Sequence, residues 1–244
     1  MIPPREGLYA PAFVQALFDR MAASYDRVSS LTSFGFSIRW RKAFLGKLPQ
    51  GANVRVLDLM TGRGELLPLL VQKSAPEAIY ALDFSAGMLE GVRKMNKDKF
   101  GNQLHIVAGD ALAMPFENLF FDALVCGFGL KTLNNAQTEL LATEVYRILK
   151  PGGSGRFIEV SVPPGRVLRL LYGFHLGRVV PFLGKLLLGN PASYRMLWQY
   201  NRLFQNAAQA AEIFRKQGFT VIYKRYFYGC ATGFTIEKPL AAQT

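Results

Sequence analysis

A glycine turn directly after an apolar run is the first feature of the sequence that could do chemistry. Residues 56–66 read VLDLMTGRGEL, so Gly62 and Gly64 follow a short run of strand-forming residues. Glycines at the end of a strand let a ligand approach the backbone, and the following helix offers its N-terminal amides. A dinucleotide fingerprint would need a third glycine where Leu67 stands, so a pyrophosphate site is disfavoured.

Three carboxylates accompany that turn. Asp58 precedes it, and Asp83 and Asp110 end the next two apolar runs. A single such carboxylate is often only a helix N-cap. At the edge of one parallel sheet, however, Asp83 could receive two ribose hydroxyls, Asp110 could reach an adenine amino group and Asp58 could hold an ammonium. Together they fit a nucleoside with an amino-acid tail and no phosphate, and S-adenosylmethionine matches that description.

The elements that must position these residues are short apolar runs alternating with helical patterns. The runs predict strands at 54–60, 78–84, 104–110, 121–130 and 155–161. Helices are expected near 65–74, 85–96 and 136–149, the last ending at Pro151-Gly152-Gly153. This alternation predicts an α/β fold with a mostly parallel sheet covered by helices on both faces. After a helix at 207–217, strands at 220–228 and 231–238 predict a hairpin over Gly229 with one antiparallel strand.

Length and composition favour one packed domain. The chain has 244 residues, of which 50% are hydrophobic. We expect a single domain over 1–244, with four segments in order along the chain: a helical cap (1–50), a cofactor-binding core (51–161), a lid insert (162–206) and a C-terminal helix with a strand hairpin (207–244). Helices at 12–21 and around 38–48 would build the cap.

Charge and cysteine content narrow the partners and the compartment. The net charge of +12 predicts attraction to an anionic partner, but no long basic run or target-reading module indicates nucleic acid. Cys126 and Cys230 stand in apolar surroundings and are expected to be core residues of a protein from a reducing compartment. Without a signal-peptide pattern or a spanning run, we expect a cytoplasmic protein, and the composition is compatible with a homo-oligomer.

With these motifs the chain resembles class I S-adenosylmethionine-dependent methyltransferases, and more narrowly the ubiquinone/menaquinone-biosynthesis C-methyltransferases of the UbiE/MenG type. The resemblance extends from Phe18 to Pro239. Its most family-specific pieces are the YD near the start, the FGLKT loop and the Tyr-rich insert with SYR. The segments that carry it are FDRMAASYD (18–26), SIRWRK (37–42), VLDLMTGRGEL (56–66), LDFSAGML (82–89), GDALAMPFENLFFD (109–122), FGLKT (128–132), RILKPGG (147–153), IEVSVP (158–163) and SYR (193–195).

The resemblance implies a doubly wound, Rossmann-like sheet of seven strands and a binding site for S-adenosylmethionine. The residues that would hold the cofactor are Asp58, Gly62 and Gly64 at the methionyl part, Asp83 and Phe84 at the ribose, and Asp110 and Ala111 at the adenine. Members of this family methylate a ring carbon of a polyprenylated hydroquinone, which requires alignment and removal of a proton. No metal is implied.

The resemblance and the position of the insert also suggest an acceptor site. The residues expected there are Lys131, Tyr25 and Tyr194 as catalytic groups, and Thr132, His175 and Arg195 as substrate contacts. Each has a structural alternative: Tyr25 could pack helices in the cap, His175 could be half-buried in an aromatic helix, and Tyr194 and Arg195 could belong to an ordinary surface helix. Lys131 and Thr132 could be neutral variation in a tolerant loop. The insert at 165–189, apolar with scattered Arg and Lys, would either contact anionic lipid at the inner membrane face and admit a prenyl tail, or simply pack on the sheet.

Two segments, the glycine turn and the FGLKT loop, depart from the family pattern. The family turn usually reads Gly-Gly-Thr-Gly-Asp, whereas residues 61–65 read Thr-Gly-Arg-Gly-Glu, so Arg63 would either pair with the cofactor carboxylate or crowd the pocket. The family loop Phe-Gly-Leu-Arg-Asn reads Phe-Gly-Leu-Lys-Thr, and Lys131 lacks the planar fork of arginine. The expected function is ring C-methylation of a lipophilic phenol or quinol. The alternatives are an O- or N-methyltransferase of another hydrophobic metabolite, and a cofactor-binding homologue without transfer activity.

Overall fold

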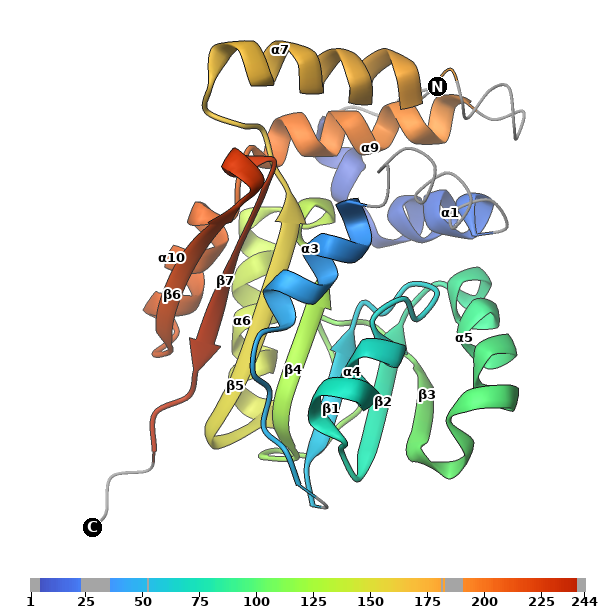
Figure 1. Ribbon diagram of the computed structural model, residues 1–244, viewed down its shortest axis with the longest axis vertical. Helices are drawn as coiled ribbons and strands as arrows, with labels where there is room; N and C mark the ends of the chain where they lie inside the picture. The colour runs from blue at the N-terminus through green and yellow to red at the C-terminus, as the bar shows by residue number, and fades with distance from the viewer. Residues whose placement is uncertain (1–4, 23–35, 52, 181, 183–190, 241–244) are drawn as a thin grey trace.

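The chain folds around a single seven-stranded sheet in the computed structural model, which describes residues 5–22, 36–51, 53–180, 182 and 191–240 (Figure 1). The strand order is β3-β2-β1-β4-β5-β7-β6. Neighbours among β1 to β5 pair in parallel, whereas β7 runs antiparallel to both β5 and β6. The strands are β1 (Arg55–Leu59), β2 (Ala78–Asp83), β3 (Leu104–Ala108), β4 (Phe121–Gly127), β5 (Leu149–Val160), β6 (Thr220–Tyr226) and β7 (Ala231–Glu237).

Helices cover both faces of the sheet, as the alternating pattern predicts. One face packs against α3 (Phe36–Leu45), α4 (Leu67–Ser74) and α5 (Ala86–Lys99). The other packs against α6 (Asn135–Ile148) and α10 (Ala208–Lys216). In β1, Val56 is buried against the first set while Leu57 and Leu59 are buried against the second, because side chains alternate along a strand. The uninterrupted apolar runs therefore belong to strands that are covered twice.

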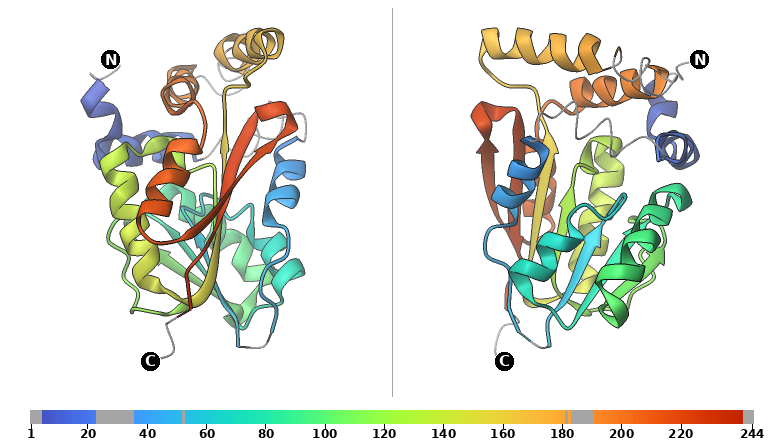
Figure 2. Two further views of the ribbon diagram at one scale, coloured as in Figure 1. Left: turned by 90° about the vertical axis from the view of Figure 1, so that its left-hand side faces the viewer. Right: turned by 45° about the vertical axis from the view of Figure 1, so that its right-hand side comes forward.

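A third layer lies over the carboxyl ends of the parallel strands (Figures 1 and 2). Its helices are α1 (Pro11–Met21), α7 (Arg166–Phe174) and α9 (Pro191–Phe204). Residues of the N-terminal segment, among them Leu8 and Leu17, form a separate apolar cluster with Met196 and Tyr200 of α9. The Tyr200 hydroxyl donates to the Leu8 carbonyl. The start of the chain and the insert thus pack together above the strand ends.

Short helical turns complete the described chain. They are η1 (Arg5–Tyr9), η2 (Gly101–Gln103), η3 (Leu130–Thr132) and η5 (Phe227–Gly229), with one π-helical stretch, η4 (His175–Val179).

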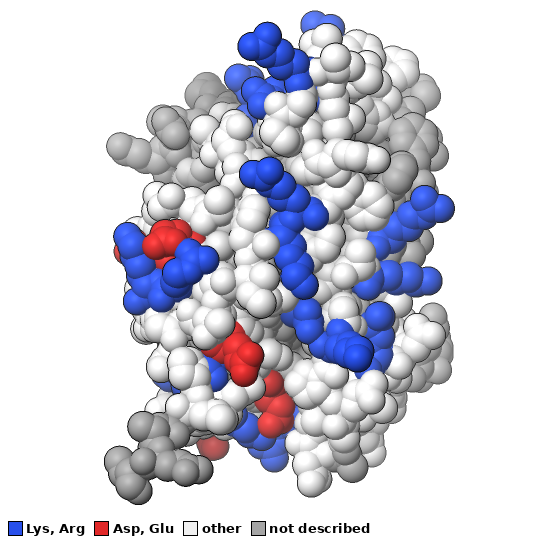
Figure 3. All heavy atoms as spheres, turned by 60° about the vertical axis from the view of Figure 1, so that its left-hand side comes forward, with Lys and Arg blue, Asp and Glu red and all other residues white. Residues whose placement is uncertain are grey.

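Basic side chains run along much of the face shown in Figure 3, while the acidic ones there gather in its lower part and at one side. Where the structure describes the chain, no helix is both long enough and apolar enough to cross a membrane.

Several element boundaries differ from the sequence prediction, and the start of β5 differs most. Strand β5 begins at Leu149, so Pro151-Gly152-Gly153 lies within the strand and does not form the loop expected after α6. The pairing of β4 with β5 shifts register here, and Gly152 has φ +75, so the glycines form an irregularity in a continuing strand. Strand β4 ends at Gly127, because the loop beyond it turns into η3. The prediction that Cys126 and Cys230 are core residues is confirmed, since both are free and buried.

Candidate active site

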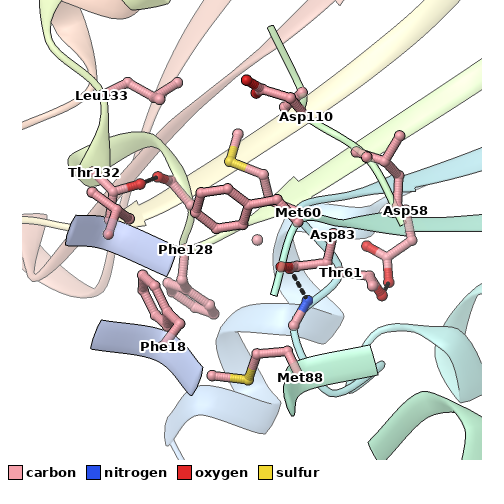
Figure 4. A pocket seen from close by; sticks show the side chains of 18 of the residues that line it. Phe18, Asp58, Met60, Thr61, Asp83, Met88, Asp110, Phe128, Thr132 and Leu133 are labelled. Carbon is pink, nitrogen blue, oxygen red and sulfur yellow. Dashed lines mark hydrogen bonds between the residues drawn. The ribbon is translucent and has the colours of Figure 1, made fainter. Parts of the chain in front are cut away.

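A cavity opens at the carboxyl ends of β1, β2 and β4, beneath α1 (Figure 4). About 980 Å³ of space inside it is free of atoms, part of it open to solvent. Its walls come from segments far apart in the sequence. The residues that line it are Tyr9, Pro11, Val14, Phe18, Arg41, Asp58, Met60, Thr61, Gly62, Glu65, Leu66, Leu82, Asp83, Phe84, Met88, Gly109, Asp110, Ala111, Leu112, Gly127, Phe128, Gly129, Thr132, Leu133 and Gln137.

The two glycines of the turn have different environments. Gly62, with φ +60, lines the cavity, and its amide donates to Asp83 Oδ2 at 2.9 Å. Gly64, with φ +83, does not line the cavity. A Cβ placed on Gly64 would lie 2.7 Å from Leu67 Cδ1, so the absence of a side chain there lets the turn pack against α4. Of the two glycines in this turn, therefore, Gly62 is the one that offers its backbone to a ligand.

Asp58 is the most unusual group in the cavity wall. Its side chain is fully buried, and Oδ2 accepts a hydrogen bond from Thr61 Oγ1 at 2.6 Å. Oδ1 is buried and has no hydrogen-bond partner. Burial raises the pKa of Asp58 to about 7, and the nearby negative charges of Glu65 and Asp83 add to this effect against the Thr61 hydrogen bond. An unsatisfied buried oxygen on a cavity wall is a site for a cationic donor.

Asp83 is held in place by backbone amides. Oδ2 accepts from Gly62 and Oδ1 accepts from Ser85, each at 2.9 Å. Burial raises the pKa of Asp83 to about 6, although these hydrogen bonds oppose the change. Each oxygen keeps a further lone pair, so the carboxylate can also accept from the hydroxyls of a ligand.

The remaining cofactor candidates also reach the cavity. The carbonyl of Phe84 accepts from Gln15 Nε2 of α1 at 2.7 Å, which joins the end of β2 to the N-terminal segment. Asp110 is exposed and Oδ1 accepts from the Leu112 amide at 2.9 Å, while Ala111 is buried. Six of the seven predicted cofactor residues thus line the cavity, and Gly64 is the exception.

The cavity wall contains a cation that was not predicted from the sequence. Arg41 of α3 lines the cavity, and its guanidinium lies 3.4 Å from Glu65 Oε1 and 5.7 Å from the ring centre of Phe128. Arg41 stands in the SIRWRK segment, which was a usable signal for it. The apolar part of the wall was not predicted either, because its members come from separate elements. They include Val14, Phe18, Met60, Met88, Leu112, Phe128 and Leu133.

Of the predicted acceptor residues whose side chains the structure describes, Thr132 is the one that lines the cavity. It is buried, and its Oγ1 donates to the Gly129 carbonyl at 2.7 Å. Lys131 does not line the cavity. Its ammonium lies 2.9 Å from Glu159 Oε1, also donates to the Phe128 carbonyl, and is buried with Glu159 behind the loop. The Lys131 charge is thus paired with Glu159 outside the cavity wall.

Two further acceptor candidates, His175 and Arg195, are not brought to the cavity. His175 is half-buried in η4 and Arg195 is exposed on α9, and neither lines the cavity. Tyr194 belongs to α9, but its side chain lies outside the described part of the structure, as does the whole of Tyr25.

Arg63 follows neither course expected from the sequence. Its guanidinium donates to the Ala22 carbonyl at 2.8 Å, and its side chain lies against Gly91 of α5, where a Cβ would come 3.0 Å from Arg63 Cζ. Arg63 is not part of the cavity wall. It joins the glycine turn to the end of α1.

Comparison with known protein families assigns this chain to one of them. The model of the ubiE/COQ5 methyltransferase family matches residues 8–237. The chain belongs to this family. It is an S-adenosylmethionine-dependent methyltransferase, and the predicted seven-stranded class I fold is confirmed.

Individual relatives give the same result. This methyltransferase is 33% identical to the demethylmenaquinone methyltransferase of Lactiplantibacillus plantarum over 221 residues, which are 89% of this chain and 92% of that protein. It is also 33% identical to the demethylmenaquinone methyltransferase of Thermus thermophilus, over 91% of this chain and all of that protein. Among solved structures, phosphoethanolamine N-methyltransferase 2 of Haemonchus contortus with S-adenosylhomocysteine aligns with a TM-score of 0.62. At 15% identity, over 91% of this chain and 60% of that one, it shows the fold alone.

Proposed function

We propose that this methyltransferase transfers the methyl group of S-adenosylmethionine to a ring carbon of a lipophilic hydroquinone, as a step in the biosynthesis of a quinone such as menaquinone. The support is the name shared by relatives at 33% identity, which cover about nine-tenths of this chain. One observation in the cavity carries the proposal. Fixed carboxylates occupy the strand ends, and an apolar wall faces the same space.

The residues present fit the cofactor. The unpaired Oδ1 of Asp58 suits its ammonium, and the Asp83 carboxylate suits two ribose hydroxyls. Arg41 can turn from Glu65 toward the cofactor carboxylate, since both side chains line the cavity. The backbone after β3, at Asp110 and Ala111, suits the adenine. When bound, S-adenosylmethionine supplies the electrophilic methyl group on its sulfonium.

The acceptor would lie against the apolar wall. Phe18, Phe128 and Leu133 offer a surface that excludes water and accommodates an aromatic ring. C-methylation replaces a ring hydrogen by the methyl group, and loss of a phenolic proton makes the ring carbon nucleophilic. Thr132 Oγ1 donates its own hydrogen to Gly129, so its lone pairs remain to accept from a phenolic hydroxyl. Lys131 would act indirectly, because its pair with Glu159 fixes the loop that carries Phe128 and Thr132.

The test is product identification. Purified protein, methyl-labelled cofactor and a reduced, short-chain demethylmenaquinone should give a product whose label sits on a ring carbon by NMR. A label only on oxygen or nitrogen would contradict ring methylation and favour the heteroatom alternative. Absence of turnover with every acceptor, despite intact cofactor binding, would instead favour a homologue without transfer activity.

Cofactor binding is measured separately by calorimetry. We expect a dissociation constant in the micromolar range, about −8 kcal/mol. Asp83→Ala should weaken it at least about tenfold, because a hydrogen bond to a charged group contributes roughly 1.5–3 kcal/mol. Asp122→Asn is the matched control, since Asp122 pairs with Lys150 and does not line the cavity.

A further inference from the structure

Helix α7 presents an apolar stripe to solvent. We define the α7 stripe as Val167, Leu170, Leu171 and Phe174, which recur at i, i+3, i+4 and i+7 and are therefore on one side of the helix. Their exposed fractions are 74%, 74%, 61% and 54%. The opposite side of α7 packs on the protein through Leu168 and Tyr172. The helix thus has two apolar sides, and only one of them is covered.

Such exposure is concentrated in this part of the chain. Most large exposed apolar residues elsewhere in the described chain occur singly or at the β6–β7 turn, for example Leu140 on α6. Phe182, just beyond η4, adds a further exposed aromatic ring, 63% accessible. Scattered exposed leucines need no explanation, but a contiguous apolar stripe marks a binding surface.

The charged residues in the sequence on both sides of the stripe have one sign. Between Glu159 and Glu212 the sequence contains no acidic residue, while the six basic ones are Arg166, Arg169, Arg178, Lys185, Arg195 and Arg202. This stretch alone supplies half of the net charge of +12. Arg166 precedes the stripe and Arg178 follows it, both exposed, and the Arg178 guanidinium lies 5.7 Å from the ring centre of Phe174. Basic side chains therefore border both ends of an apolar surface.

The position of α7 leaves the stripe accessible. It is the outermost helix at the end of the molecule where the parallel strands end (Figures 1 and 2), the same end at which the cavity opens. The turn between β6 and β7 lies toward this end as well and carries Tyr228, which is 90% exposed. That turn contacts the chain leading into α7, because a Cβ on Gly229 would lie 2.8 Å from Pro164 Cδ.

We propose that α7 binds flat on an anionic phospholipid surface. The stripe enters the boundary between headgroups and acyl chains, and Arg166 and Arg178 lie at the level of the phosphates. An apolar helix side bordered by basic residues, in a stretch of sequence without acidic ones, is the pattern of interfacial helices, which bind through apolar burial and attraction to anionic lipid. Docking would bring the cavity to the membrane surface, where a lipophilic acceptor is dissolved. The binding itself does not depend on the acceptor proposed above.

The experiment is flotation of the full-length protein with lipid vesicles. Vesicles of phosphatidylcholine with about 30% phosphatidylglycerol are compared with phosphatidylcholine alone at roughly 0.1 M salt, where surface charges are still felt. The wild type should float with the anionic vesicles only. Leu170→Gln/Leu171→Gln should lower the partition coefficient at least tenfold, whereas Leu140→Gln on α6, also an exposed leucine, should leave it unchanged.

A second pair of variants tests the charges. Arg166→Gln/Arg178→Gln should weaken binding by about thirtyfold, since each basic residue near the surface contributes about 1 kcal/mol, or about fivefold. Arg93→Gln, an exposed arginine on α5, is the control for net charge. None of these residues lines the cavity, so unchanged cofactor affinity shows that each variant is folded.

Several outcomes would overturn the proposal. They are a wild type that stays with the soluble fraction, a stripe variant that floats like the wild type, and equal binding to neutral vesicles. A second copy of this chain is the other candidate to cover the stripe, and sedimentation velocity tests it by measuring whether the protein is a monomer or a dimer. If the wild type is a dimer and Leu170→Gln/Leu171→Gln makes it a monomer without changing flotation, the stripe joins two copies of this chain and does not bind lipid.

Discussion

Replacing Asp58 by asparagine should stabilise the free protein and weaken its cofactor binding. Above about pH 7 the folded protein holds an ionised carboxylate at this buried position, which is unfavourable until a cationic group binds to it. Asp58 is fully buried, and burial raises its pKa from 3.8 to about 7. Since the folded-state pKa is the higher one, the folded state binds this proton more tightly than the unfolded state. The free energy of unfolding therefore falls as the pH rises from the unfolded-state pKa of 3.8 to the folded-state pKa of about 7, and the loss is complete above about pH 7.

The size of the effect follows from the pKa. A rise of about three units corresponds to about 4 kcal/mol at high pH. Asp58→Asn removes the charge, but it places an amide NH₂ near the unpaired Oδ1 position, which costs about 1–3 kcal/mol for a buried donor without an acceptor. The net gain is about 1–3 kcal/mol at about pH 8, or several degrees in Tm for a chain of this size. At about pH 5 the folded carboxyl is mostly protonated, and ionisation of Asp58 in the unfolded chain leaves a cost of only about 2 kcal/mol to the wild type. The same amide penalty of about 1–3 kcal/mol offsets this cost, so the two proteins should differ by about 1 kcal/mol or less.

Cofactor affinity should respond in the opposite direction. The ammonium of the cofactor needs the ionised carboxylate, which is roughly a tenth populated at about pH 6 and about three-quarters populated at about pH 7.5. Ionisation of Asp58 therefore makes wild-type binding about eightfold tighter at the higher pH, and Asp83, whose pKa is about 6, adds about twofold. Asp58→Asn should keep only the twofold pH dependence due to Asp83, and it should bind the cofactor at least about tenfold more weakly than the wild type at about pH 7.5.

Two measurements check these expectations. Scanning calorimetry of the cofactor-free proteins gives Tm at both pH values, and titration calorimetry in two buffers of different ionisation enthalpy gives affinity and proton release. Asp122→Asn is the control, because its carboxylate pairs with Lys150 outside the cavity. A lower Tm for Asp58→Asn at about pH 8 would refute the inference of an unfavourable buried charge. Retention of the full pH dependence of binding would refute the assignment of the ammonium to Asp58.

Three further substitutions test residues around the cavity. Lys131→Met should lower the free energy of unfolding by about 3–5 kcal/mol in urea, because Glu159 is then buried without its cation, and adding Glu159→Gln should restore most of it. Gly64→Ala should destabilise by more than Gly101→Ala, since both have positive φ but only the first would overlap a neighbouring side chain; equal losses would contradict this. Arg63→Thr should leave cofactor affinity within about threefold while hydrogen exchange in α1 speeds up, because it removes a hydrogen bond from a charged group, of roughly 1.5–3 kcal/mol, to the end of that helix; a larger loss of affinity would place Arg63 at the cofactor.

Much of the scaffold could be predicted from local patterns. Uninterrupted apolar runs separated by helical segments are typical of parallel strands covered on both faces, and the hairpin over Gly229 with its antiparallel strand is confirmed. The carboxylates at the ends of β1 and β2 meet because parallel strands end at one edge of the sheet. Asp58, Asp83 and Asp110 accordingly line one cavity. The boundary of β5 was wrong, because glycines that usually end an element here form an irregularity inside a strand.

Side-chain direction in the loops could not be predicted. The FGLKT segment indicated a charge near the acceptor, but Lys131 pairs with Glu159, which lies 28 positions later on β5. The turn suggested that Arg63 would approach the cofactor, yet it donates to Ala22, 41 positions earlier. Both side chains are long and flexible, so the nearest acceptor in space decides where the charge lies.

The sequence by itself thus determined the succession of strands and helices along the chain, the glycine at position 62 of the turn, which leaves the backbone accessible, and the presence of carboxylates at the strand ends. These depend on neighbouring residues and on the repeat of a strand or helix. The tertiary structure alone decided that Arg41 of α3 enters the cavity, that Lys131 is buried away from it, and that the α7 stripe is left uncovered. An amphipathic pattern specifies a helix with an apolar side, but whether that side is buried depends on what packs above it, and that is fixed by contacts between residues far apart in the chain.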